Sequence, residues 1–300
     1  MMVSSAGEAA TSGVSLVDII NVLIINIFAA VATGGAVVTS QFLGQKRKDR
    51  ACQSADQLIL VTGVVALVIM TLSILFRWQI LNLIYKGVTE EVMKNAVIYL
   101  TISAISYPFL AVYNSCAALF RSMGNSKISM QASIIMNVIN VIGDALFIFG
   151  FHWGIKGAAW ATVIGQIVSG IMVIVYFGRF RKMGLKKEMF RPRGHLLKMI
   201  LSLGMASCIN QIAMAVVQIT MNNTLRYYGA ASVYGTDIPL ACVGVISKVN
   251  MVFMAIAIGI SQGCQPIWGY NYGAGSYDRV KRTYWKAFRV AMTVGIVFFL

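Results

Sequence analysis

Long apolar runs dominate this sequence, and they restrict it to a small set of folds. A helix needs about 20 mostly apolar residues to cross the hydrocarbon core of a bilayer. The runs are continuous and lack the period-2 alternation of membrane-barrel strands, so they predict transmembrane helices. We expect spans near 16–42, 57–83, 96–120, 128–150, 157–178, 196–222 and 238–268, with a further span that begins near 283.

The positions of the basic residues predict how these helices are oriented. The chain is only 12% charged, against about 25% in soluble domains. Most of its 25 lysines and arginines fall in every second loop, at 46–50, 121–127, 179–198 and 279–289. This positive-inside pattern predicts a multi-pass protein of the inner (cytoplasmic) cell membrane, with these loops in the cytoplasm. It also argues against nucleic-acid binding, because a nucleic-acid binder gathers its charge on one face.

A weak internal repeat divides the sequence. The stretch 40–50 returns at 269–279, at the same point of the hydropathy pattern. At one fixed offset, Gly34 falls on Gly263, Gly44 on Gly273, Asp49 on Asp278 and Arg50 on Arg279. An even number of predicted spans separates the copies, so both point the same way through the membrane. Parallel repeats of this kind are typical of secondary transporters, whose two bundles enclose a site near the midplane.

The length of the repeat bears on the domain organisation. Two full copies do not fit into 300 residues, so we expect a chain truncated at both ends. The intact protein would be an all-α bundle of about twelve helices, of which about eight are present here. We predict an N-terminal helical lobe at 1–180 that lacks its first helix, a basic cytoplasmic linker at 181–195, and the start of a C-terminal helical lobe at 196–300.

Asp144 is the acidic residue that we place deep within a predicted span. Asn140 and Asn137 precede it at helical spacing, so the three residues share one face. A charged aspartate at the bilayer centre costs roughly 2.5–3.5 kcal/mol, and such residues usually face a cavity. Burial favours the neutral acid. We interpret Asp144 as a proton or Na⁺ site with the two asparagines as its hydrogen-bonding shell; the alternative is a polar stripe that joins two helices.

Other polar residues within the spans are candidates for a substrate chamber. Gln211 and Gln218 share a face of the span 196–222, and Thr162 and Gln166 share a face of the span 157–178. Each pair either contacts substrate or forms hydrogen bonds between helices. Lys248 either faces a central cavity or extends its ammonium group to the interface.

The sequence does not favour an enzyme. It contains no phosphate-binding GxxxxGK[ST] loop, so we expect no ATP hydrolysis by this chain. His152 and His195 lack a second ligand at metal spacing. A single intramembrane acid does not supply the carboxylate pair of an aspartyl mechanism. We therefore predict no catalytic residue, no metal site and no cofactor.

Several stretches carry a family resemblance. They are GGAVVTSQFLG at 34–44; ALFRSMGNSK at 118–127, continuing through Asp144 to GAAWAT at 157–162; and GISQGCQPI at 259–267 with YNYGAG at 270–275. Together they span nearly the whole chain and resemble the multidrug and toxic compound extrusion (MATE) family.

The resemblance implies a V-shaped antiporter of about twelve helices that exports small organic cations in exchange for H⁺ or Na⁺. Asp144 and Asn140 resemble the fifth-helix pair that many members use for cation coupling. The family's other coupling acid, on the first helix, has no counterpart here. Some members carry a seventh-helix glutamate where this chain has Asn210 and Gln211, and this departure favours H⁺. We expect a monomer whose partners are its substrates and the lipid bilayer.

Two other functions remain open. One is a lipid-linked oligosaccharide flippase of the same superfamily, which would need a basic cavity for anionic headgroups. The predicted spans offer one lysine, Lys248, and one acid, Asp144. This balance of charge does not distinguish a flippase from an exporter of cations. The other is a nonfunctional membrane fragment, in which polar stripes would face lipid at a cost of several kcal/mol for each unpaired group.

Overall fold

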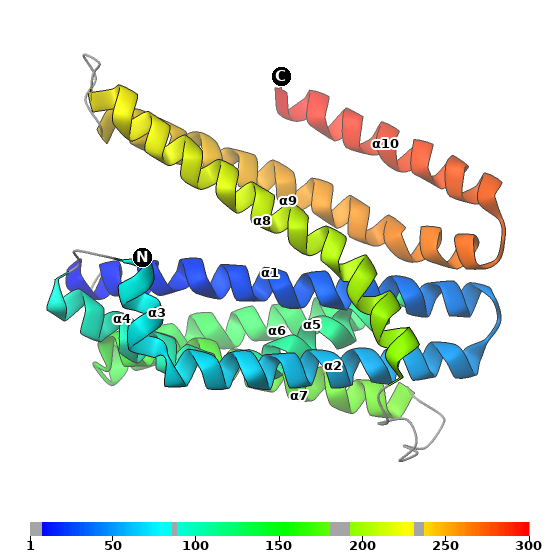
Figure 1. Cartoon of the computed structure of the whole chain (residues 1–300), viewed down its shortest axis with the longest axis horizontal. Coiled ribbons are helices and arrows are strands. Elements are labelled where there is room, and N and C mark those ends of the chain that lie inside the picture. Colours follow the sequence, from blue (N-terminus) through cyan, green and yellow to red (C-terminus); the bar gives the residue numbers. More distant parts are fainter. Residues whose placement is uncertain (1–7, 86–88, 181–192, 231–236, 300) are drawn as a thin grey trace. The chain divides into compact units, whose positions relative to one another are not determined.

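A computed structural model describes residues 8–85, 89–180, 193–230 and 237–299 (Figure 1). Throughout these ranges the regular structure is helical, so the predicted all-α class is confirmed. The helices are α1 (Glu8–Gly44), α2 (Lys48–Leu75), α3 (Arg77–Ile84), α4 (Glu90–Ala104), α5 (Tyr107–Ser122), α6 (Ser126–Ala145), a one-turn π-helix (Leu146–Gly150), α7 (Gly154–Phe180), α8 (Gly194–Ala230), α9 (Asp237–Gly273) and α10 (Tyr277–Phe299).

The predicted membrane spans agree with these helices. Among the described residues, 6 helical segments are long and apolar enough to cross a membrane, and α4 with α5 forms a seventh, bent candidate. Each predicted run up to 238–268 overlaps one of them. The segments are Thr11–Gly44, Lys48–Leu75, Ser126–Gly150, Gly154–Gly178, Gly194–Met214 and Cys242–Gly273. The further span predicted from 283 falls within α10, which is not in this set.

The bend between α4 and α5 has a local cause. The helix axes differ by 49°. Pro108 occupies the first turn of α5, and a proline in the middle of a continuous helix would remove one hydrogen bond and collide with the preceding turn. The chain instead tightens here, with the Ser106 amide donating to the Ser103 carbonyl at 3.1 Å. Pro108 then lies where a helix start tolerates it.

The chain divides into two compact units. Unit 1 contains residues 1–39 and 52–205, and unit 2 contains residues 40–51 and 206–300. The predicted linker 181–195 lies outside the described residues up to position 192. The predicted lobe boundaries therefore stay a prediction.

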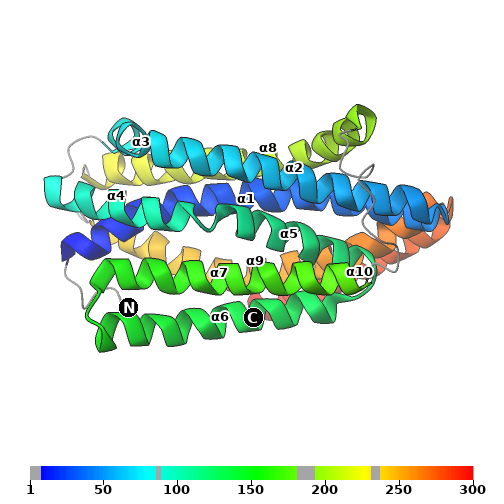
Figure 2. The same cartoon turned by 90° about the horizontal axis from the view of Figure 1, so that it is seen from below.

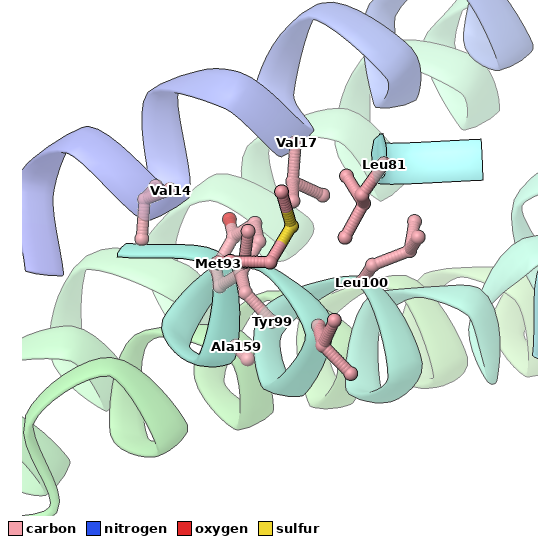
Figure 3. Packing of buried hydrophobic residues seen from close by; sticks show 9 residues of the cluster. Val14, Val17, Leu81, Met93, Tyr99, Leu100 and Ala159 are labelled. Atoms are coloured by element: carbon pink, nitrogen blue, oxygen red, sulfur yellow. The ribbon is translucent and has the colours of Figure 1, made fainter. Parts of the chain in front are cut away.

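Unit 1 has a continuous core in which α1, α3, α4 and α7 meet (Figure 3). Val17 of α1, Leu81 of α3 and Leu100 of α4 are fully buried in this cluster. Tyr99 belongs to the same cluster, and α7 contributes Ala159. Helices α6 and α7 lie side by side within the unit (Figure 2).

Glycines permit close helix crossings in both units. In unit 1, a Cβ atom on Gly34 of α1 would overlap with the Ile200 carbonyl oxygen of α8. In unit 2, a Cβ atom on Gly44 would overlap with the Tyr270 carbonyl oxygen, and one on Gly273 with the Gln41 carbonyl oxygen. Close backbone approach through small residues is the usual way in which helices associate in membranes.

The two copies of the repeat form matching helix corners. After α1, the amides of Gln45, Lys46 and Arg47 donate to the carbonyls of Gln41, Leu43 and Phe42. After α9, the amides of Ala274, Gly275 and Ser276 donate to the carbonyls of Tyr270, Tyr272 and Asn271. The pattern is the same at the repeat's own offset. In each corner one residue adopts the left-handed conformation: Lys46 at φ 60° and Gly275 at φ 72°.

Candidate functional site

Asp144 lies in the last turn of α6, directly before the π-helix. The residue is half-buried, and its Oδ1 atom is buried without a hydrogen-bond partner among the described residues. A buried carboxylate oxygen without a partner is costly, so a site of this kind is stabilised by a bound proton or cation. This property is the one expected of an ion-coupling residue.

The two asparagines predicted around Asp144 make different contacts. Asn140 Nδ2 donates to Thr162 Oγ1 of α7 at 3.0 Å. Thr162 Oγ1 in turn donates to the Ala158 carbonyl at 3.1 Å. The exposed Asn137 donates to the Ser133 carbonyl of its own helix at 2.8 Å. The structure thus joins Asn140 and Thr162, and the role of both asparagines as a shell for Asp144 stays a prediction.

Helix packing brings Asn140 and Thr162 together. A Cβ atom on Gly143 of α6 would lie 2.9 Å from the Ala161 Cβ of α7. One on Gly165 of α7 would lie 2.9 Å from the Met136 carbonyl oxygen of α6. The two helices therefore approach closely on both sides of the Asn140–Thr162 hydrogen bond, which allows such short side chains to meet.

Tyr99 of α4 is a central residue of this region that sequence reasoning missed. Its side chain is 7% exposed. The Tyr99 hydroxyl donates to Asp18 Oδ1 of α1 at 3.4 Å. Tyr99 thus connects α4 with α1, and it lies in the core cluster to which α7 contributes Ala159.

Asp18 corrects one expectation. The sequence predicts Asp144 as the single intramembrane acid, and Asp18 lies close to the start of the predicted run 16–42. The candidate span in α1 begins at Thr11, so Asp18 lies inside it. The signal that could have revealed Asp18 is its setting in the apolar sequence VSLVDIINVL.

One turn further along α1, Asn21 makes a second polar contact with the bent α4–α5 pair. Its Oδ1 atom accepts a hydrogen bond from the Tyr107 hydroxyl at 2.8 Å and one from the Ser103 hydroxyl at 3.5 Å. Tyr107 is 2% exposed and packs edge-on against Phe28 of α1. These contacts fix α1 against the start of α5.

The remaining predicted substrate residues do not join this group by any described contact. Gln166 follows Thr162 by one turn of α7, and its Oε1 atom is buried without a hydrogen-bond partner in the described part of the chain. Gln211 of α8 and Lys248 of α9 belong to unit 2, and both are exposed. Gln218 lies in α8, but its side chain is outside the described part of the structure. All of these roles stay predictions.

Comparison with known proteins places the chain in a family. The MatE family model matches residues 1–146 and 206–300. The uncharacterized transporter YisQ of Bacillus subtilis is 27% identical over 297 residues, which cover 95% of this chain and 63% of YisQ. The multidrug export protein MepA of Staphylococcus haemolyticus is 25% identical over 240 residues, which cover 80% of this chain and 51% of MepA. The chain therefore spans less than two thirds of the length of these relatives.

The fold of this chain is also the fold of solved MATE transporter structures. The outward-facing structure of a multidrug resistance MATE family transporter of the MOP superfamily superposes with a TM-score of 0.90 at 19% identity, over 99% of this chain and 64% of that protein. The family model covers most of the sequence, and the helices include several that are able to span a membrane. This multi-pass membrane protein therefore belongs to the MatE family, whose members are transporters rather than enzymes.

Proposed function

We propose that this sequence belongs to a multidrug efflux antiporter of the cytoplasmic membrane, which exports small organic cations in exchange for protons. The observation that carries the proposal is the buried, unpartnered Oδ1 atom of Asp144, in the region of the described structure where Asn140, Thr162 and Tyr99 gather. Relatives named as multidrug export proteins support the substrate class. The antiporter would act as a monomer and need no cofactor.

Protons are favoured over Na⁺ by the chemistry of the side chains. Na⁺ needs several oxygen ligands, whereas a carboxyl group alone suffices to carry a proton. The site therefore offers Asp144 as a proton carrier.

A flippase for anionic lipid-linked sugars receives less support. Such a protein would need basic side chains in its cavity. The polar region described in unit 1 instead contains two carboxyl groups: Asp18, which accepts a hydrogen bond from Tyr99, and Asp144. This charge suits cationic substrates and coupling protons.

The test is ethidium efflux from a pump-deficient bacterium that expresses the whole reading frame containing this sequence. Wild type should export ethidium, a protonophore should abolish export, and replacement of Na⁺ in the buffer should leave it unchanged. Asp144→Asn should reduce export to the background of cells without the protein. The matched control is Asp278→Asn, the same change at an exposed position in the first turn of α10. Export by Asp144→Asn at the wild-type rate would overturn the proposal, and no export by well-expressed wild type would favour the flippase.

A further inference from the structure

We propose that the first half of α10 carries a binding site for the headgroup of an anionic phospholipid. The site is an open pocket of about 480 Å³, lined by Arg282, Trp285, Lys286 and Arg289. Its volume falls within the usual range for ligand pockets, roughly 300–1,000 Å³. The pocket shares no residue with the proposed ion-coupling region. The inference therefore goes beyond the proposed function and does not depend on it.

The three basic residues of the pocket lie on one face of the helix. Lys286 follows Arg282 by four residues and Arg289 follows it by seven, which is the spacing of neighbours on a helix surface. All three are exposed. None of them forms an ion pair with an acid in the described part of the chain, although Asp278 lies one turn before Arg282. Their positive charges are therefore available to an anion from outside the chain.

This face lies on the side of α10 away from α9, its neighbour within unit 2 (Figure 1). Tyr284 packs against Trp268 of α9 with ring centroids 6.2 Å apart, and Phe298 packs against Phe253 of α9 at 5.7 Å. At 3.6 residues per turn, the basic residues of the pocket fall on the opposite side of α10 from these two aromatic contacts. The pocket is therefore not part of the packing between the two helices.

Trp285 forms the apolar wall of the pocket, and neighbouring rings hold it in position. Its ring centroid lies 5.9 Å from that of Tyr284 and 5.7 Å from that of Phe288, both in edge-on contacts. Tryptophan is enriched at the interface between membrane and water, where its ring lies at the depth of the lipid headgroups. This preference favours a position of the pocket at the depth of the lipid phosphates.

The same face of α10 changes from basic to apolar after Arg289. Met292 and Ile296 continue the face, and both are exposed. Thr293 lies between them, but its hydroxyl donates to the Arg289 carbonyl at 2.9 Å, so this polar group is satisfied within the helix. A basic stretch followed by an apolar one matches a phospholipid, because the phosphate is at one end of the lipid and the acyl chains extend from it.

The side chains of the pocket also suit this ligand chemically. An arginine guanidinium can form two parallel hydrogen bonds with phosphate oxygens, and a lysine ammonium adds a point charge. The sequence predicts that residues 279–289 lie on the cytoplasmic side. Anionic lipids of the cytoplasmic leaflet attract basic residues next to a membrane helix. The pocket should therefore prefer a lipid with a net negative charge over a zwitterionic one.

Native mass spectrometry of the purified full-length protein tests the site. Phosphatidylglycerol is the anionic probe and phosphatidylcholine is the zwitterionic one. In titrations, one phosphatidylglycerol molecule should bind at least about tenfold more tightly than phosphatidylcholine, because three basic residues contribute to the attraction. The triple variant Arg282→Gln/Lys286→Gln/Arg289→Gln should lose this preference.

The matched control removes the same charge from another basic loop. It is Arg47→Gln/Lys48→Gln/Arg50→Gln, at three exposed positions, and it should keep the preference for phosphatidylglycerol. Equal loss in the two triple variants would overturn the inference, because the preference would then follow the total charge of the protein rather than this pocket. Equal binding of the two lipids by wild type would overturn it as well.

A soluble competitor distinguishes a lipid from a free phosphate ester. Glycerophosphoglycerol has the headgroup without acyl chains, and it should not displace phosphatidylglycerol at equal concentration; displacement would overturn the assignment to a lipid. If the triple variant of the pocket does not purify as a monodisperse protein, Arg282→Gln and Trp285→Ala decide, and each should weaken the binding of phosphatidylglycerol. Ethidium efflux enters none of these measurements, so failure of the proposed function is recognised separately.

Discussion

Among the described residues, the polar side chains within the helices of the two compact units make different contacts. In unit 1 these residues meet one another across helices: Asn140 binds Thr162, and Tyr99 binds Asp18. In unit 2 the comparable residues Gln211 and Lys248 are exposed on their helices. A polar group in a membrane is tolerated when it has a partner or lines a watery space. Similar spacing along a helix therefore does not by itself identify a coupling site.

The largest expected effect contrasts two ionisable residues within candidate spans, Asp144 of unit 1 and Lys248 of unit 2. Asp144→Asn should lower proton-driven ethidium efflux at least about tenfold, because an amide cannot carry the coupling proton. Lys248→Gln should retain most of the activity if the exposed ammonium group only extends to the interface. Both variants are measured in the same cells at matched expression. Equal loss in both would show that the units share the coupling chemistry and would remove the contrast between them.

Close packing, in contrast to polar chemistry, is common to both units. Gly34→Val and Gly44→Val should each destabilise the protein by about 1–3 kcal/mol, because the new side chain meets a backbone carbonyl oxygen. Thermal unfolding in detergent measures the loss. The matched control is Gly63→Val in α2, where a Cβ atom meets nothing within 4 Å. A control as unstable as the two crossing variants would contradict the packing argument.

Removal of the hydrogen bond between α6 and α7 should have a smaller effect on the stability of the protein. A double-mutant cycle with Asn140→Ala and Thr162→Val should yield a coupling energy of about 0.6 kcal/mol, the average for such bonds in membranes. Unfolding in lipid bicelles provides the free energies. Additive changes would show that the bond contributes nothing to stability.

The smallest effect is expected in unit 2. Gln211→Ala removes an exposed amide, so it should change the stability by less than about 0.5 kcal/mol. If efflux of ethidium falls although the stability is unchanged, Gln211 contacts substrate, as the sequence suggests. If neither changes, Gln211 has no measurable role.

The sequence predicts the spans well, because continuous apolar runs report directly on the thickness of the bilayer. Asp144 is predicted as a candidate for the same reason, as an acid within such a run. Tyr99 carries no comparable signal, since a tyrosine in a helix of this kind is ordinary core. Its meaning depends on Asp18, which lies 81 positions away in the chain and meets it only in the folded protein. The break before Pro108 is also missed, because the apolar run continues through it.

The matching corners after α1 and α9 have a consequence for how the helices fold during insertion into the membrane. Each corner is closed by backbone hydrogen bonds among seven consecutive residues, 41–47 and 270–276, so its turn requires nothing from the rest of the chain. Local contacts of this kind form quickly. A pair of helices can therefore reverse direction as soon as it leaves the ribosome and enters the membrane. Lys46 also places a positive charge in its corner, and by the positive-inside rule this charge would favour the cytoplasmic side that the sequence predicts for this loop.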